Sequence, residues 1–146
     1  ELLLNIETKA AFDNIDEIIE KCDKRISGFV LGRSDLKKSL YIENPDDDLI
    51  LDYCISLSAE AQKRGKKFIL GGKINSKSVD FISKIPYLTS IETRKVIFDN
   101  SGLKEENLEK FLQFELQMLK FKKSSYKEDE ERINFIESSL KTKELV

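Results

Sequence analysis

The sequence predicts an α/β fold built from parallel strand–helix units. Short apolar runs with the length of buried strands alternate with segments in which apolar residues recur at helical spacing. The strand segments are apolar almost throughout, as in parallel sheets that helices cover. With 146 residues, 40% of them hydrophobic, the chain has the size of one domain and can bury a modest core.

The first two units lie in the N-terminal third of the chain. An apolar run at residues 2–6 predicts a strand, and the helical spacing of residues 10–22 predicts an amphipathic helix after it. A second buried strand is expected at residues 26–32, followed by a short helical turn at residues 36–40. The strand–helix pattern therefore repeats.

The next helix has a recognisable start signal. Asn44 is expected to cap it, with Pro45 at the first helical position and acids at residues 46–48 facing the positive end of the helix dipole. The helix is expected to end at Gly65. Because the start signal accounts for the three aspartates, they do not predict a metal cluster.

Two further strands complete the series. Residues 67–70 predict the third strand, with a loop at residues 71–73, and residues 76–85 predict a short helix that ends at Pro86. The fourth strand is expected around residues 87–91. Four parallel units amount to half of a (β/α)₈ barrel, so residues 1–102 are interpreted as half of a TIM barrel with two open sheet edges.

Residues 103–146 predict a C-terminal helical extension. Two charged amphipathic helices are expected at residues 105–122 and 126–142, with no strand between them. They are more apolar than an exposed helix tolerates, which predicts packing on the barrel or on a second subunit in a homo-oligomer. The apolar residues are Leu108, Phe111, Leu112, Met118, Leu119, Phe121, Ile133, Phe135, Ile136 and Leu140.

Composition excludes several classes of function. Twenty-five basic and 27 acidic residues give a net charge of −2, which offers no field for nucleic acid, and no segment predicts a membrane span. The distant Cys22 and Cys54 fit buried thiols in a reducing compartment, so a cytoplasmic location is expected. The absence of histidine removes the commonest general base and zinc ligand. With no initiator Met before the first strand, the sequence is expected to be part of a larger protein.

Two carboxylates stand directly after predicted strands. Glu7 and Asp35 are separated by 27 residues, enough for one helix and its loops, so they are expected on adjacent strands at one rim. Parallel neighbours lie about 4.8 Å apart, which lets both carboxylates reach one Mg²⁺ or Mn²⁺ ion. Alternatively, Glu7 favours the N-terminus of the helix that follows it, and Asp35 caps the turn at residues 36–40.

The residues around this pair resemble a known metal site. The HpcH/HpaI aldolase and citrate lyase β-subunit superfamily typically reads as an "IET" strand end, a "nldeI" helix and a "GpsDLa.sLG" strand end. The corresponding element of pyruvate kinase, "KIEN…fdeI…ARGDL", is similar. The segments of this chain that carry the resemblance are Asn5-Ile6-Glu7-Thr8-Lys9-Ala10, Ile15-Asp16-Glu17-Ile18 and Gly28-Phe29-Val30-Leu31-Gly32-Arg33-Ser34-Asp35-Leu36.

The resemblance implies that residues 1–102 are the second half of the barrel, strands 5–8, and it implies roles for individual residues. Glu7 and Asp35 would be the metal ligands, and Gly32 and the backbone N–H groups of Ser34 and Asp35 would meet a substrate carboxylate. Asn5 would be a catalytic residue, because it stands where pyruvate kinases carry a catalytic lysine and where the aldolases often carry an amide. Kinase chemistry is therefore disfavoured.

Arg33 replaces the proline that many of these aldolases carry. As a catalytic residue it would add positive charge near an anionic substrate. Alternatively, its side chain points to solvent.

Two further loops carry candidate ligand contacts. Gly71 and Gly72 would let a ligand approach the backbone, with Lys73 meeting a carboxylate or phosphate, although a plain turn is the alternative and the spacing is not that of a Walker A loop. The end of the fourth predicted strand carries Thr89, Ser90 and Glu92. They are either ligand contacts or solvated loop residues.

The expected function is that of a metal-dependent carbon–carbon lyase or aldolase. By the resemblance, Mg²⁺ or Mn²⁺ would chelate a 2-oxo acid and stabilise a pyruvate-type enolate. The alternatives are a citrate-lyase-like cleavage of an acyl-CoA and an inactive barrel retained for binding or assembly.

Overall fold

The computed structural model describes residues 1–122 and 126–141 and has an α/β fold. One sheet has the strand order β1-β2-β3-β4-β5; the first four strands are parallel, and β5 runs antiparallel to β4. The strands are β1 Leu3–Asn5, β2 Gly28–Gly32, β3 Lys67–Gly71, β4 Ser90–Glu92 and β5 Ile97–Asp99. The prediction of parallel strand–helix units is thus confirmed, and the described residues form an open sheet.

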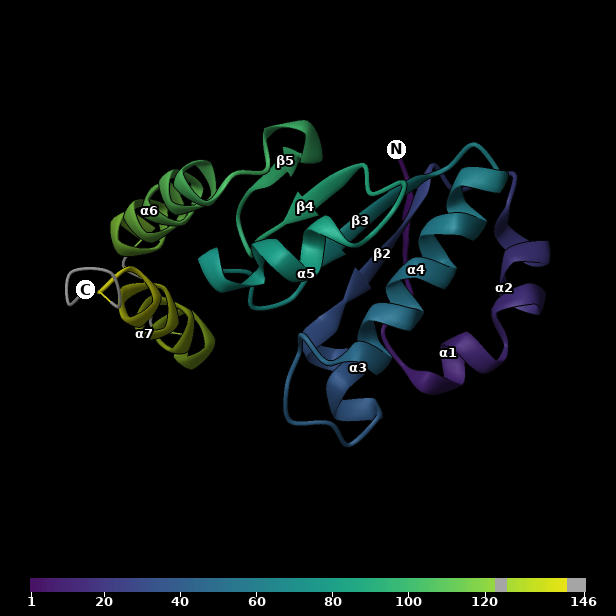
Figure 1. The fold of residues 1–146 in the computed structure, drawn as a ribbon, viewed down its shortest axis with the longest axis horizontal. Coiled ribbons are helices and arrows are strands. Elements are labelled where there is room, and N and C mark those ends of the chain that lie inside the picture. Colours follow the sequence, from purple (N-terminus) through teal and green to yellow (C-terminus); the bar gives the residue numbers. More distant parts are fainter. Residues whose placement is uncertain (123–125, 142–146) are drawn as a thin grey trace.

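Helices connect the parallel strands as the sequence predicted (Figure 1). The expected helix at residues 10–22 is broken at Asn14, whose side chain donates a hydrogen bond to the carbonyl oxygen of Ala10. The helices are α1 Lys9–Asp13, α2 Ile15–Cys22, α3 Arg33–Ser39, α4 Asp48–Lys63, α5 Val79–Ser83, α6 Glu105–Lys122 and α7 Lys127–Lys141, with 3₁₀ turns η1 Ser76–Ser78 and η2 Asn100–Gly102.

The start of α4 differs from the prediction. Asp47, and not Asn44, is the N-cap, because its side chain accepts a hydrogen bond from the Leu49 amide at 2.9 Å. Asn44 instead accepts from the amide of Asp46 in a turn that precedes the helix. Asp46 is also no helix-dipole residue, because it forms an ion pair with Arg33.

The hydrophobic core lies on one face of the sheet. Phe29 and Leu31 of β2 and Phe68 and Leu70 of β3 are completely buried there. Figure 1 shows α4 lying across β2 and β3 on this face. Each of these side chains contributes about 1.5–3 kcal/mol by burial, so this layer fixes the strands whose ends form the site.

The opposite face of the sheet carries glycines and polar residues around the buried Val30 and Ile69. Side chains alternate between faces along a strand, so Gly28, Val30 and Gly32 of β2 point away from the core side chains. A Cβ atom on Gly28 would lie 2.6 Å from the backbone oxygen of Lys67, which requires glycine where β2 and β3 meet. Val30 and Gly32, together with Gly71 of β3, line a cleft.

The fifth strand was not predicted. β4 and β5 form a hairpin in which the amide of Thr93 donates to the carbonyl oxygen of Val96 at 2.7 Å. The strand has three residues, too few for a readable alternation, and only Phe98 is buried, stacked on Phe111 of α6. β5 covers the edge of β4, which was expected to be open.

The C-terminal helices α6 and α7 pack on the same core. Leu108, Leu112 and Leu119 of α6 and Ile136 of α7 are buried in it. The two helices were predicted within one residue of their described ends; Thr142, the predicted last helical residue, lies outside the described residues.

A buried ion pair joins α6 to α7. Both carboxylate oxygens of Glu115 accept hydrogen bonds from Arg132, at 3.0 and 2.7 Å. The Glu115 side chain is 0% exposed and that of Arg132 is 10% exposed. The position of α7 therefore depends on a pair that only the folded chain brings together.

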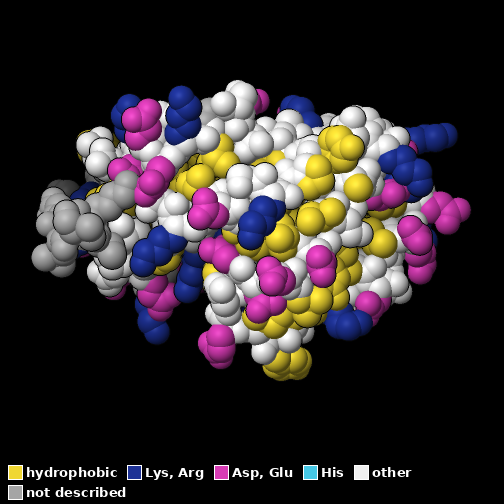
Figure 2. Space-filling model, viewed as in Figure 1, with side chains coloured by type: hydrophobic (Ala, Val, Ile, Leu, Met, Phe, Trp, Pro, Cys, Tyr) yellow, Lys and Arg dark blue, Asp and Glu magenta, His cyan; other side chains and the backbone are white. Residues whose placement is uncertain are grey.

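Some apolar surface remains outside the core. On the face shown in Figure 2, hydrophobic side chains gather over the region of α4, where Phe12, Leu49 and Tyr53 line a groove. Met118 and Phe121 of α6 are exposed as well, and their packing against a second subunit stays a prediction. Among the described helices, none is long and apolar enough to cross a membrane.

Candidate functional site

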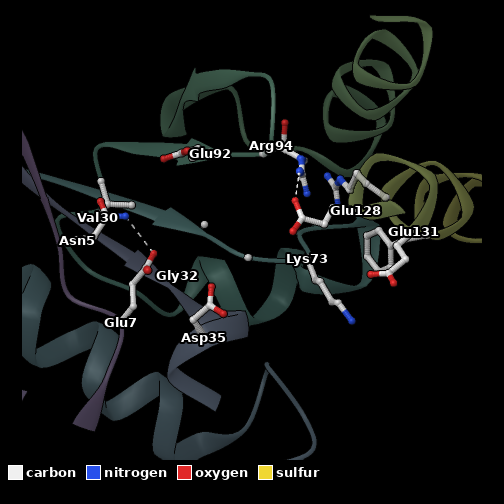
Figure 3. A pocket seen from close by; sticks show the side chains of 15 residues that line it. Asn5, Glu7, Val30, Gly32, Asp35, Lys73, Glu92, Arg94, Glu128 and Glu131 are labelled. Atoms are coloured by element: carbon white, nitrogen blue, oxygen red, sulfur yellow. Dashed lines mark hydrogen bonds and ion pairs between the residues drawn. The ribbon is translucent and has the colours of Figure 1, made fainter. Parts of the chain in front are cut away.

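A cleft of about 390 Å³ lies at the carboxyl ends of the parallel strands. Residues that follow β1, β2, β3 and β4 line it on one side, and α7 lines it on the other (Figure 3). Its lining residues are Asn5, Glu7, Val30, Gly32, Asp35, Gly71, Gly72, Lys73, Glu92, Thr93, Arg94, Glu128, Glu131, Arg132 and Phe135. Seven residues of this set were predicted as site residues, namely Asn5, Glu7, Gly32, Asp35, Gly71, Gly72 and Lys73.

Glu7 enters the cleft from the segment that follows β1. Its Oε1 accepts a hydrogen bond from Asn5 Nδ2 at 3.3 Å. The carboxylate lies against the backbone of Gly32, where an added Cβ atom would be 2.3 Å from Oε1. Glu7 does not serve the helix that follows it, because Thr8 is the N-cap of α1 and accepts from the Ala11 amide.

Asp35 enters the same cleft from the first turn of α3. It does not cap that helix, whose N-cap is Gly32 and has no side-chain capping bond. Its Oδ1 lies 2.8 Å from Nζ of Lys38, and both side chains are largely exposed. An exposed pair of this kind is worth little energetically, so the Asp35 carboxylate can exchange Lys38 for another cation.

The cleft gathers negative charge. Burial raises the pKa of Glu7 above its ordinary value, and the negative charges of Asp35 and Glu92 raise it further. Burial also raises the pKa of Glu92. Figure 3 shows Glu7 and Asp35 projecting from neighbouring segments, with Glu92 on β4 across the cleft. A cation bound among these three carboxylates would offset their repulsion.

Glu7 and Asp35 are the cleft residues that could hold a hard divalent cation as a two-carboxylate site. Mg²⁺ usually keeps several waters and takes one or two carboxylates, with the substrate supplying further oxygens. Within residues 1–122 and 126–141, no group of three or more His, Cys, Asp or Glu side chains is arranged to hold a metal ion. The protein itself would thus supply two ligands, and Glu92 would contribute charge without coordination.

The loop after β3 reaches the cleft in an unusual backbone conformation. Gly72 has a φ of +92° and Lys73 a φ of +47°. The left-handed conformation costs a non-glycine residue about 1–3 kcal/mol, and such strain often marks a ligand site. Gly71, Gly72 and Lys73 all line the cleft, and their contact with a ligand stays a prediction.

Arg33 lies away from the cleft, and neither of its expected positions is correct. Its side chain is 0% exposed, so it does not point to solvent, and it does not border the space open to a substrate. The guanidinium instead forms an ion pair with Asp46 and lies over the ring of Phe81, 5.2 Å from its centroid. Because its guanidinium lies outside the cleft, Arg33 cannot add positive charge next to a substrate, as the catalytic role expected of it requires.

Ser34 is also absent from the cleft lining. Its backbone nitrogen lies against Gly72, where an added Cβ atom would be only 2.6 Å away. In the described part of the chain, Ser34 Oγ is buried without a hydrogen-bond partner. The expected contact between the Ser34 amide and a substrate is thus blocked by the close approach of Gly72.

Helix α7 supplies the wall of the cleft that the sequence did not predict. Arg94, just after β4, lies 3.0 Å from a carboxylate oxygen of Glu128 and 3.2 Å from one of Asp129. The strand-end rule that identified Glu7 would also have identified Arg94 if the strand had been placed at its true end. No local signal marks Glu128, because its place in the cleft depends on how α7 folds back.

Only one of the three residues expected near the fourth strand end reaches the cleft. Glu92 lines it, whereas Thr89 and Ser90 do not. Thr89 accepts a hydrogen bond from the amide of Phe68 at 3.1 Å and so connects β3 to the segment that precedes β4.

Comparisons with known proteins do not assign the chain to a family. No protein-family model matches it, and neither a search of curated proteins nor one of solved structures finds a match. The candidate site therefore rests on the residues and on their geometry.

The metal-free protein is expected to become more stable when Glu7→Gln removes the cleft carboxylate. A carboxyl group whose pKa is raised by folding stabilises the native state at low pH, and this contribution is lost as pH rises through the raised pKa. The variant should therefore melt above the wild type at pH 7 in EDTA, with a difference that shrinks toward the ordinary pKa of Glu. Thermal melts across this pH range measure it.

Glu20→Gln on the exposed surface of α2 is the matched control and should follow the wild-type pH profile. A Glu7→Gln protein that is less stable than the wild type at pH 7 would show that the carboxylate is held by favourable contacts instead.

Proposed function

We propose that this chain carries the metal-binding side of a divalent-metal-dependent carbon–carbon lyase or aldolase that acts on a 2-oxo acid. One observation carries the proposal: Glu7 and Asp35, which follow neighbouring parallel strands, lie in one cleft at the carboxyl ends of those strands. This rim is where (β/α)₈ enzymes keep their active sites. The mutual repulsion of the carboxylates adds a physical reason for a cation to bind there.

The residues of the cleft have distinct parts in this proposal. Glu7 and Asp35 would hold Mg²⁺ or Mn²⁺, and the ion would supply the positive charge that stabilises an enolate next to a carboxylate. Asn5 donates to Glu7 and orients that ligand. Lys73, on the loop after β3, would meet an anionic group of the substrate.

We further propose that the parallel sheet is the second half of a (β/α)₈ barrel. Helix α4 packs on one face, and the buried Val30 and Ile69 point to the other, as branched residues do in the interior of such a barrel. Earlier strands would pair with β1, whose second edge has no partner among the described residues. The antiparallel β5 occupies the edge of β4 at which the first strand of a closed barrel would pair, so closure of the barrel would require β5 to leave that edge.

Titration of the chain with Mn²⁺, followed by electron paramagnetic resonance of the free ion, tests the metal site. We expect one saturable site per chain. A chain that leaves Mn²⁺ free at millimolar concentration contradicts the proposal and favours a barrel retained for binding or assembly.

Turnover assays on the Mn²⁺-loaded protein then separate the two reactions. Release of pyruvate from a 4-hydroxy-2-oxo acid is the expected activity. Cleavage of an acyl-CoA thioester in place of pyruvate release would identify the citrate-lyase-like reaction.

A further inference from the structure

The side chain of Arg33 is completely buried between α3, the loop after β3 and the α5 region. A guanidinium is costly to bury unless it is paired and fully hydrogen-bonded. Asp46 supplies the opposite charge, and Ser78 Oγ lies 3.4 Å from both Arg33 Nη2 and Asp46 Oδ2. Burial lowers the pKa of Arg33 to about 10, which leaves the side chain charged at neutral pH.

Two donors of this guanidinium hold successive residues of the loop after β3. Nη2 donates to the carbonyl oxygen of Gly72 at 2.8 Å, and Nε lies 3.4 Å from that of Gly71. The planar, rigid guanidinium fixes the relative position of both oxygens, whereas the ammonium of a lysine, with rotatable donors on a flexible stem, would hold them less rigidly.

The backbone of the first turn of α3 holds the same loop from a second direction. The Gly72 backbone approaches so closely that an added Cβ atom would lie 2.8 Å from the backbone nitrogen of Arg33. Arg33 therefore contacts the loop through both its backbone and its side chain. These contacts supply the restraint that a left-handed Lys73, with a φ of +47°, requires.

The restrained loop brings Lys73 to the cleft. In the view of Figure 3, Lys73 lies between Asp35 on α3 and Glu131 on α7. Its backbone conformation sets the direction in which the side chain leaves the loop, so a change in φ at Lys73 would move its ammonium group relative to Asp35.

We propose that Arg33 is a positioning residue. By holding the carbonyl oxygens of Gly71 and Gly72 it keeps the loop in its left-handed conformation and places Lys73 where it binds an anionic group of the substrate. The part played by the anion rests on the proposed function, whereas the restraint on the loop does not require a metal.

Arg33→Lys in the full chain tests this proposal, with Arg64→Lys as the control. Arg64 forms ion pairs with Glu60 and Asp23 and does not line the cleft. In metal-free protein, nuclear magnetic resonance signals of the Gly72 and Lys73 amides should shift in Arg33→Lys only. The Mn²⁺ affinity should stay within about twofold of wild type, while the affinity of Mn²⁺-loaded protein for oxalate should fall about tenfold, as expected for a displaced binding group.

A double variant decides whether Arg33 acts through Lys73. If it does, Arg33→Lys should change oxalate affinity little in a Lys73→Ala background, because the two effects are not additive. Fully additive losses, or an Arg33→Lys protein that resembles Arg64→Lys in every measurement, would overturn the proposal.

The wild-type chain provides a measurement that does not depend on how the variants fold. The Nε–H signal of Arg33 should be protected from exchange with solvent, as expected for a buried donor; rapid exchange would overturn the proposed restraint. If the wild type binds no Mn²⁺, the proposed function fails, and the amide signals of the loop still decide whether Arg33 positions it.

Discussion

Asp35→Asn is expected to weaken Mn²⁺ binding by about 100-fold. Substitution of residues that only orient a metal ligand already lowers metal affinity by about 10- to 100-fold, and Asp35 would be a ligand itself. The substitution removes one of only two carboxylate ligands that the protein would supply, while the side chain keeps its size and its place in the first turn of α3. Glu7→Gln should have a comparable effect, because the second ligand is lost instead. Mn²⁺ titration measures both.

The control for this prediction is Asp80→Asn. Asp80 is an exposed aspartate in the first turn of α5, which is a short helix like α3. It does not line the cleft. It should bind Mn²⁺ as the wild type does. Equal affinities for Asp35→Asn and Asp80→Asn would remove Asp35 from the metal site.

Glu115→Ala is expected to lower the free energy of unfolding by about 3–5 kcal/mol, the usual cost of removing one partner of a buried ion pair. Arg132, whose side chain is only 10% exposed in the wild type, would lose its bidentate partner. For a domain of this size the melting temperature should fall by about 10 °C. Thermal denaturation followed by circular dichroism measures this loss.

The control is Glu137→Gln, which removes an ion pair with Lys120 between the same two helices. That pair is partly exposed to solvent, so its loss should have a much smaller effect. Replacing Glu115 and Arg132 together by Leu and Met should restore much of the stability, since no unpaired charge stays buried. A Glu115→Ala protein as stable as Glu137→Gln would show that the pair does not hold α7 in place.

Most secondary structure could be predicted because it follows from local periodicity. The buried strand at Gly28–Gly32 and the amphipathic helices α6 and α7 have patterns long enough to read. The three-residue strand β5 does not. The start of α4 was misplaced because Asn44 and Asp47 are both suitable caps, and only the backbone conformation of the preceding turn favours Asp47.

The sequence by itself determined which loops meet at one end of the sheet. Parallel strands place their carboxyl ends together, so residues just after the strands, such as Glu7, Asp35 and Lys73, were expected at one rim, and all three line the cleft. This inference needs only the strand positions and their direction. The metal and the reaction stay proposals that the resemblance and this geometry support.

The tertiary structure alone decided which side chains face the cleft and what closes it. Arg33 and Asp35 are two residues apart, yet one is buried against Asp46 and the other lies in the cleft, because residues at that separation project from different sides of α3. The opposite wall depends on Glu115 and Arg132, which belong to different helices. Contacts between such distant parts of the chain have no local periodicity, so only the packed fold specifies them.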